Sequence, residues 1–449
     1  VFNCPGWSQS GGPWVKPEMA MRYMTYSEAS ITGGKNVKLN LYKPTHEFQD
    51  AYVLAFPSIE SEKNVILIDN AKVSILPAVE NQNNLIDKDT SNVVQFLKDV
   101  KNYTVDIVAN EPIIANSLKI IPGKKIIDVD CDLFYKTGND FKLLKSFKIS
   151  RSKLDPNVGP DKYAPLLINL PEIRSSHFKL DFKLKGSTNP SWDIAEISIS
   201  EDSGLEYYAE KNLSKMFPTP FPAWDSYIWG QQKEITNKNQ KINLNDVLDI
   251  SDKMDTEGNL IWNAPAGNWT IQRFGMTPTG TKNSPSAPQG KGYEIDKANK
   301  ELVQFHYNQF IGELLKRIPE ESKSAFKYVI ADSYEMGSQN WTDDFEKKFE
   351  SKFGYNPVKY LPVYSGRIVG SVEESERFLW DLRRSVADAV AYEYVGGLRE
   401  ASNKDNLQLW LENYGHWGFP SEFLMYGGQS DLVSGEFWNE GTLGDIECK

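Results

Sequence analysis

Hydrophobic and polar positions alternate with two different periods along this chain. Between about residues 35 and 280 apolar residues recur at every second position, in short segments separated by Gly, Pro, Asn and Asp. Such spacing is typical of the strands of an all-β sandwich. The clearest segments are V-K-L-N-L-Y, A-Y-V-L-A-F, Y-T-V-D-I-V, H-F-K-L-D-F and A-E-I-S-I-S. Residues 22–27 alternate in the same way and predict an earlier strand.

After about residue 281 helical patterns alternate with short apolar runs. Residues 297–317 predict an amphipathic helix whose apolar face carries Leu302, Val303, His306, Phe310, Leu314 and Leu315. We expect His306 on this face to be a core histidine with a partner, rather than a metal ligand. Thr342 is the predicted cap of a helix that Gly354 ends, and Ser371 with Glu374 forms a capping box for a longer helix to about residue 401.

Three apolar runs in this last zone predict strands, and acidic motifs follow them. The runs are F-K-Y-V-I-A at 326–331, L-Q-L-W-L at 407–411 and L-V-S-G-E-F-W at 432–438. A (β/α)8 barrel places its catalytic groups at the carboxyl ends of its strands. With residues 22–27 counted, four of eight strands are visible. The predicted fold is therefore α/β plus β: an incomplete barrel (1–34 and 281–449) interrupted by a β-sandwich with its connecting strands (35–280).

Length and charge narrow the class of protein. A chain of 449 residues exceeds the size of a single core, so two or more domains are expected. A net charge of −11 argues against nucleic acid as a partner, and no apolar run is long enough for a membrane span. Cys4, Cys131 and Cys448 are too far apart in sequence for a disulfide framework or a zinc site. The chain opens at Val1 without a signal peptide, and we expect a fragment cut at both ends, so the sequence does not indicate the compartment.

The segment from Trp410 to Glu447 contains the densest chemistry. It holds seven carboxylates and eight aromatic rings but no lysine or arginine. Carboxylates among aromatic faces suit acid–base chemistry at a sugar, and they also suit calcium. The simpler alternative is that these acids are solvated and these rings are core. We expect at least two of Glu412, Glu436 and Glu440 to line a site.

Several long motifs resemble those of the glycoside hydrolase family 106 α-L-rhamnosidases. They are G-W-S-Q-S-G-G-P-W-V-K-P-E (6–18), A-P-A-G-N-W-T-I-Q-R-F-G-M-T-P-T-G (264–280), D-S-Y-E-M-G-S-Q-N-W-T (332–342), E-N-Y-G-H-W-G-F-P (412–420) and G-G-Q-S-D-L-V-S-G-E-F-W-N-E-G-T-L-G-D-I-E (427–447). Within the β-rich zone, residues 85–94, 133–144 and 175–182 resemble a discoidin or galactose-binding-like jelly roll. Such modules bind sugars in some proteins, and a purely structural insertion is the expectation here.

The resemblance implies inverting hydrolysis of terminal α-L-rhamnose in polysaccharide or oligosaccharide, assisted by calcium, in the periplasm or outside the cell. Glu335 matches the family's general acid, and Glu436, together with Glu412, is expected beside the metal. The remaining candidates for sugar contacts are Asp332, Asn413, His416 and Trp438. For the general base, Glu440 is the candidate within this chain and Glu436 is its competitor. The family's base also matches a motif beyond Glu447, which would place it outside this sequence.

Two other functions remain open from the sequence. A retaining glycosidase would use Glu335 and Glu436 as acid and nucleophile with carboxyls about 5 Å apart, whereas inversion needs roughly 6.5–9.5 Å. A non-catalytic carbohydrate-binding protein would need an aromatic or calcium-lined groove within residues 85–200. Trp192 is the only tryptophan in that range, so this function ranks last.

Overall fold

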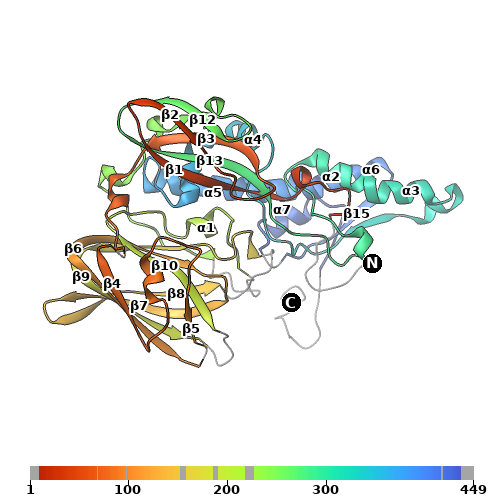
Figure 1. Ribbon diagram of the computed structural model, residues 1–449. Coiled ribbons are helices and arrows are strands. Elements are labelled where there is room, and N and C mark those ends of the chain that lie inside the picture. The colour runs from red at the N-terminus through yellow and green to blue at the C-terminus, as the bar shows by residue number, and fades with distance from the viewer. Residues whose placement is uncertain are drawn as a thin grey trace.

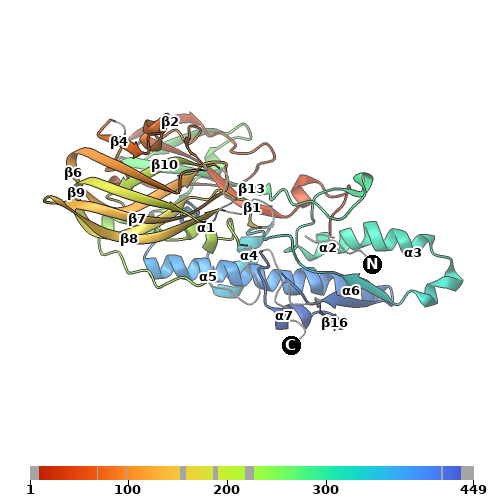
Figure 2. The same cartoon turned by 90° about the horizontal axis from the view of Figure 1, so that it is seen from below.

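The protein is described by a computed structural model that covers residues 10–67, 69–97, 99–151, 158–185, 191–217, 227–415 and 418–435. Two β-sheet bodies lie side by side, and a helical arm that carries a small parallel sheet extends away from them (Figure 1). In the perpendicular view α5 and α6 follow one another from beneath the sheet bodies into the arm (Figure 2). The arm and the sheet bodies are thus connected by one long run of helix.

The larger sheet body is a seven-stranded antiparallel sheet. Its strands follow the order β5-β10-β6-β9-β7-β8, with β4 beside β6. Breaks in the pairing of β6 with β9, after Val108 and after Ala115, bend these long strands so that the sheet wraps around its own core. The strands are β4 (Ala71–Leu76), β5 (Val94–Phe96), β6 (Asn102–Pro122), β7 (Ile127–Thr137), β8 (Asp140–Arg151), β9 (Leu166–Leu184) and β10 (Trp192–Ser200).

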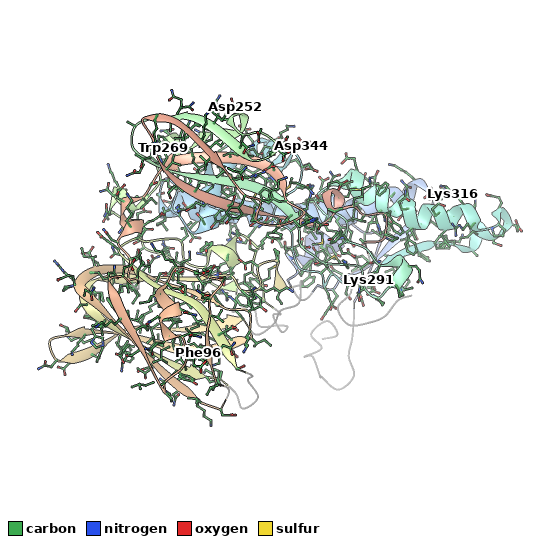
Figure 3. All side chains as sticks on the ribbon, in the orientation of Figure 1. Phe96, Asp252, Trp269, Lys291, Lys316 and Asp344 are labelled. Atoms are coloured by element: carbon green, nitrogen blue, oxygen red, sulfur yellow. The ribbon has the colours of Figure 1, made fainter. Side chains whose placement is uncertain are left out.

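Trp192 stabilises the inside of this sheet. Its ring stacks on Phe96 with the ring centroids 3.9 Å apart, and it is only 1% exposed. Figure 3 labels Phe96 within this body. The one tryptophan that could have lined a sugar groove on residues 85–200 is therefore a core residue.

The second body is a four-stranded sheet in the order β1-β13-β3-β11, accompanied by the β2–β12 pair. It corrects one prediction. Residues 22–27 do form a strand, but β1 pairs antiparallel with β13 along its full length, from Arg22 opposite Pro278 to Thr32 opposite Asn268. β1 is therefore no barrel strand. The elements are β1 (Arg22–Thr32), β2 (Lys35–Asn40), β3 (Gln49–Pro57), β11 (Leu248–Asp249), β12 (Asn259–Ala264) and β13 (Asn268–Pro278).

The parallel strands predicted near the end of the chain are present. β14 (Tyr328–Ala331), β15 (Gln408–Glu412) and β16 (Leu432–Ser434) form a parallel sheet. Among the described residues this sheet has three strands and is open, so a closed eight-stranded barrel is not seen there. The architecture is mixed α/β and rich in sheet.

Helices cover one side of the parallel sheet. The predicted amphipathic helix is present as α2 (Lys300–Tyr307), a π-helical turn (Asn308–Gly312) and α3 (Glu313–Arg317), with Asn299 as its N-cap. Figure 3 labels Lys316 near the far end of this arm. The longer helix runs through α5 (Val372–Asp388), a π-helical segment (Ala389–Val395) and α6 (Gly396–Lys404), with α4 (Phe345–Phe353) and α7 (Phe423–Gly427) beside it.

The other face of the parallel sheet is open to solvent. Exposed apolar side chains there include Ile330 (46% exposed), with Tyr328, Trp410 and Leu432 on the same face of the sheet. Parallel sheets are normally covered on both faces. None of the helices in the described part of the chain is long and apolar enough to cross a bilayer.

Candidate active site

The carboxyl ends of β14 and β15 bring several predicted site residues together. Asp332 directly follows β14, and Glu412 is the last residue of β15. Because the strands are parallel and in register, these ends lie next to each other. The pairing continues one step further, where the Tyr334 amide donates to the Tyr414 carbonyl at 2.9 Å. This edge of the sheet is the candidate active site.

Ser333 connects the two carboxylates at this edge. Its amide nitrogen lies 2.8 Å from Asp332 Oδ1 and 3.0 Å from Glu412 Oε2. Its hydroxyl donates to the same Glu412 oxygen at 2.6 Å. Two negative groups would otherwise repel each other, and the shared donors offset that repulsion. The site therefore holds two converging carboxylates in a defined position.

Glu335 lies in the same loop and is only 8% exposed. The loop is held by hydrogen bonds to distant segments. Gln339 donates to Asp296 at 2.6 Å, and Asn340 accepts from the Met24 amide and donates to the Asn212 carbonyl, both at 2.8 Å. The loop that carries Glu335 is therefore tied to β1 of the four-stranded sheet and to two loop residues, Asn212 and Asp296.

A layer of aromatic rings packs beneath Tyr334. Its ring contacts Tyr394, Phe419 and Tyr426, with centroid distances of 6.3, 5.5 and 6.4 Å. Burial raises the pKa of Tyr334 and Tyr426 well above the ordinary value, so both stay protonated. Their hydroxyls are buried and have no hydrogen-bond partner among the described residues. Buried polar atoms are rarely left so, which makes this layer a place where a ligand or water is expected.

A buried ion pair lies behind the aromatic layer. Lys297 Nζ is 2.6 Å from Glu294 Oε2, and both side chains are fully buried. The ammonium also lies 4.9 Å from the centre of the Tyr394 ring. Burial lowers the pKa of Lys297, and the nearby Glu294 carboxylate opposes that shift. The pair adds fixed dipoles to the site without adding net charge.

The first glycine-rich loop reaches this layer. The Ser10 hydroxyl and the Tyr394 hydroxyl are 2.7 Å apart. A Cβ at Gly11 would lie 2.4 Å from the Tyr293 carbonyl oxygen, so only glycine fits there. The Gly-rich motif thus brings Ser10 against residues nearly four hundred positions later.

Asn413 supplies an oxygen that lacks a partner. Its backbone amide donates to the Ser434 carbonyl at 2.8 Å, which fixes it between β15 and β16. Its side-chain oxygen is buried without a hydrogen-bond partner in the described ranges. Like the carboxylates of Asp332 and Glu412, this amide oxygen is a hard donor of the kind that calcium binds. No group of three or more His, Cys, Asp or Glu that could hold a metal occurs in the described part of the chain.

Comparison with known proteins identifies the family. Residues 1–449 match the glycoside hydrolase 106 family, described as alpha-L-rhamnosidase. The chain belongs to glycoside hydrolase family 106.

Two proteins similar to this family 106 chain are longer than it is. A protein of Formosa agariphila, provisionally named beta-glucuronidase, is 27% identical over 442 residues, which is 98% of this chain and 25% of that protein. The solved rhamnosidase from Novosphingobium sp. PP1Y has 23% identity and a TM-score of 0.76, over 95% of this chain and 40% of that one. The chain thus spans less than half the length of either protein, and the second comparison shows a shared fold.

The structure places some of the predicted site residues of this family 106 chain. Asp332, Glu335, Glu412 and Asn413 come from the ends of neighbouring strands, as predicted. The other candidates lie outside the described residues: His416, Glu436, Trp438 and Glu440.

His306 is a core histidine, as predicted. It accepts a hydrogen bond from Trp14 Nε1 at 3.3 Å, and burial lowers its pKa to about 3. It therefore stays neutral at physiological pH.

Several residues of the site were not predicted. Glu294 and Lys297 lie in a loop without any periodic pattern, and Tyr394 lies within a helix whose apolar residues look like ordinary core. A signal was available in the stretch Y-E-I-D-K-A at 293–298, where three ionic residues lie among apolar and aromatic ones. Such a stretch in a folded chain needs buried partners.

Proposed function

We propose that this chain carries the catalytic centre of an α-L-rhamnosidase that acts by inversion with calcium. The supporting observation is the buried Glu335 carboxyl at the strand edge that also holds the Asp332–Ser333–Glu412 arrangement, in a chain of this family. We further propose that β14, β15 and β16 are strands of a (β/α)8 barrel, since catalytic groups at carboxyl ends are typical of that fold.

In this proposal Glu335 is the general acid. Its burial favours the protonated form, so it can donate a proton to the glycosidic oxygen as the bond to the sugar breaks. A second carboxylate on the opposite face removes a proton from water, which attacks the anomeric carbon. Glu440 is the candidate for that base. Asp332, Asn413, His416 and Trp438 are the proposed contacts to the sugar.

Calcium is proposed at Glu412 and Glu436, with the Asn413 oxygen as a neutral donor. The unpartnered Asn413 oxygen and the nearby carboxylates fit a hard cation. When bound, calcium fixes sugar hydroxyls and offsets carboxylate charge. The substrate is then a rhamnose-containing polysaccharide or oligosaccharide, met in the periplasm or outside the cell.

The seven-stranded sheet is proposed to be a galactose-binding-like module with a structural role. Its aromatic residues Phe96, Phe182 and Trp192 pack against one another inside the core. Side chains used in this way cannot stack on a sugar.

A second candidate is a glucuronidase, which the name of the Formosa agariphila relative favours. The sugar would then carry a carboxylate, and its site would need a free cation. Lys297, the cation behind Tyr394, is already bonded to Glu294, and this favours a neutral sugar. Aryl α-L-rhamnoside and aryl β-D-glucuronide, offered to the protein in its full natural length, separate the two candidates.

The acid role is tested with Glu335→Gln in the full-length protein. We expect rates on alkyl rhamnosides to fall about 10²–10⁴-fold, whereas dinitrophenyl rhamnoside, whose leaving group needs little protonation, loses much less. NMR of the first product should show the inverted anomer. The matched control is Glu301→Gln, an exposed carboxyl in the first turn of α2. Equal losses on both substrate types would remove Glu335 from this role.

A further inference from the structure

A groove with two tryptophans lies beside α5. None of its residues has been assigned a part in the proposed reaction. It is formed by the first half of α5 and the segment 227–234, and it encloses a cavity of about 880 Å³. Trp380 on α5 is 64% exposed and Ile228 is 72% exposed. Large apolar side chains gathered at one exposed concave place commonly mark a binding site.

Arg383 lies between the two tryptophan rings. Its guanidinium carbon is 5.2 Å from the centroid of Trp229 and 5.9 Å from that of Trp380. One of its nitrogens donates to the Lys211 carbonyl at 2.8 Å. Such stacking fixes the plane of the guanidinium, so that its remaining N–H donors point in a defined direction.

The other charged side chains of the groove are already paired. Lys211 pairs with Glu376, Arg377 with Glu373, and Glu234 with Lys241. Arg383 has no carboxylate within ion-pair distance among the described residues. Burial lowers the pKa of Arg383 to about 10, with Glu376 opposing the shift, so the group remains a cation at neutral pH. A stacked guanidinium that no carboxylate of the described residues pairs with suits an anionic ligand.

We propose that this groove binds a carboxylated pyranose, a uronate residue of an acidic polysaccharide. The pyranose face would stack on Trp380, and its carboxylate would accept hydrogen bonds from Arg383. Carboxylate oxygens match the fork of guanidinium N–H groups, and aromatic faces match the C–H face of a sugar ring.

The groove is a separate site from the candidate active site. α5 continues into the π-helical segment that carries Tyr394, and Arg383 precedes Tyr394 by eleven residues. At the rise of a helix this is on the order of 16 Å along the axis. The segment Ile228–Gly230 also borders a second cavity, of about 360 Å³, whose walls carry charges of both signs: Lys145, Lys148 and Arg151 together with Glu206 and Glu210.

The test measures binding without turnover, so its result does not depend on the proposed rhamnosidase activity. The full-length protein is run through native gels that contain polygalacturonate, fully methyl-esterified pectin or dextran sulfate. We expect polygalacturonate to retard the protein, methyl-esterified pectin to do so much less, and Trp380→Ala and Arg383→Gln each to weaken retardation at least tenfold. Arg383→Lys should restore little of the retardation by polygalacturonate, because an ammonium lacks the planar fork of N–H groups.

Matched controls separate a site from a charged surface. Tyr42→Ala removes an equally exposed aromatic ring (64% exposed) outside the groove, and Arg317→Gln removes an exposed cation from α3. Both should bind polygalacturonate like the unchanged protein, and all variants should keep its melting temperature. If Trp380→Ala bound dextran sulfate as strongly as the unchanged protein does, the retardation would reflect general charge attraction. That result would overturn the proposal. Trp380 fluorescence that acrylamide cannot quench in the full-length protein would also overturn it, since the groove would then be covered.

Discussion

Replacing Ser333 with alanine should uncouple the two carboxylates at the candidate active site. The change deletes the hydroxyl that donates to Glu412 at 2.6 Å and leaves the backbone amide as the shared donor. A hydrogen bond to a charged group contributes about 1.5–3 kcal/mol. If Glu412 helps to hold calcium, the loss of this bond frees its carboxylate to rotate. We therefore expect calcium affinity and kcat/KM each to fall by roughly 10–100-fold, since about 1.4 kcal/mol corresponds to a factor of ten.

Ser338 provides the matched control in the same loop. It is as buried as Ser333 (2% against 4% exposed), and its hydroxyl makes one bond of 2.7 Å, to the Gln339 carbonyl. Ser338→Ala removes a neutral bond worth about 1 kcal/mol of stability and touches no carboxylate. The assay is calorimetric calcium titration together with hydrolysis of an aryl rhamnoside. If both variants changed calcium binding equally, the role assigned to Ser333 would be wrong.

Three further predictions concern metal, pH and the isolated chain. Chelation should remove most activity of the full-length enzyme and calcium should restore it; full activity of the metal-free enzyme would contradict the calcium proposal. Burial raises the pKa of Asp202 from 3.8 to about 7, so the folded state binds its proton more tightly and the free energy of unfolding falls as pH rises from about 4 to about 7. Asp202→Asn should therefore stabilise the protein above pH 7 by on the order of 2 kcal/mol after allowance for partial solvent screening, and flatten that pH dependence in urea titrations. Residues 1–449 expressed alone should be inactive. Protease should cut this chain first within 308–330, where Phe310, Leu314, Tyr328 and Ile330 are exposed, and should leave the seven-stranded sheet intact. A soluble, active preparation would refute this prediction.

Local sequence patterns predicted individual helices and strands well, but they predicted poorly which strands pair with each other. The helix after residue 297 and the cap at Ser371 are present, with the Ser371 hydroxyl accepting from the Glu374 amide at 3.0 Å. The strand at residues 22–27 is also present, but its partner lies about 250 residues later, in β13. Alternation records that one face of a strand is buried, and it carries no information on which strand pairs with it. The assignment of β1 to a barrel failed for this reason.

The predicted cap at Thr342 failed through competition with a distant partner. Asp344, with a φ of 57°, precedes α4 in place of Thr342, and no side chain caps that helix. The Thr342 hydroxyl instead donates to the buried Asp296 at 2.6 Å. A carboxylate with no exposure needs every donor it can reach, and that requirement outweighs about 1 kcal/mol from a helix cap. Gly354 ends the helix as predicted, since it adopts a φ of +79°.

The site was predictable where it depends on strand ends and not where it depends on loops. Asp332, Glu335 and Asn413 were found because a polar residue directly after a buried strand has a defined place in a parallel sheet. Glu294 and Lys297 were missed because their positions follow from packing against Tyr394, which no sequence period encodes. Sequence patterns therefore located the edge of the candidate site but not the groups that support it.

Asp296 explains why those supporting groups matter for the position of Glu335. It accepts hydrogen bonds from Arg22 at the start of β1 and from Gln339 and Thr342, both in the loop that follows Glu335. A buried ion pair such as Arg22–Asp296 adds little net stability, because removing both charges from water offsets their attraction. Its directional bonds do, however, fix the distance between the four-stranded sheet and the Glu335 loop. The sheet body built from β1, β3 and β13 thus helps to hold the proposed acid in place, although it contributes no residue to the proposed chemistry.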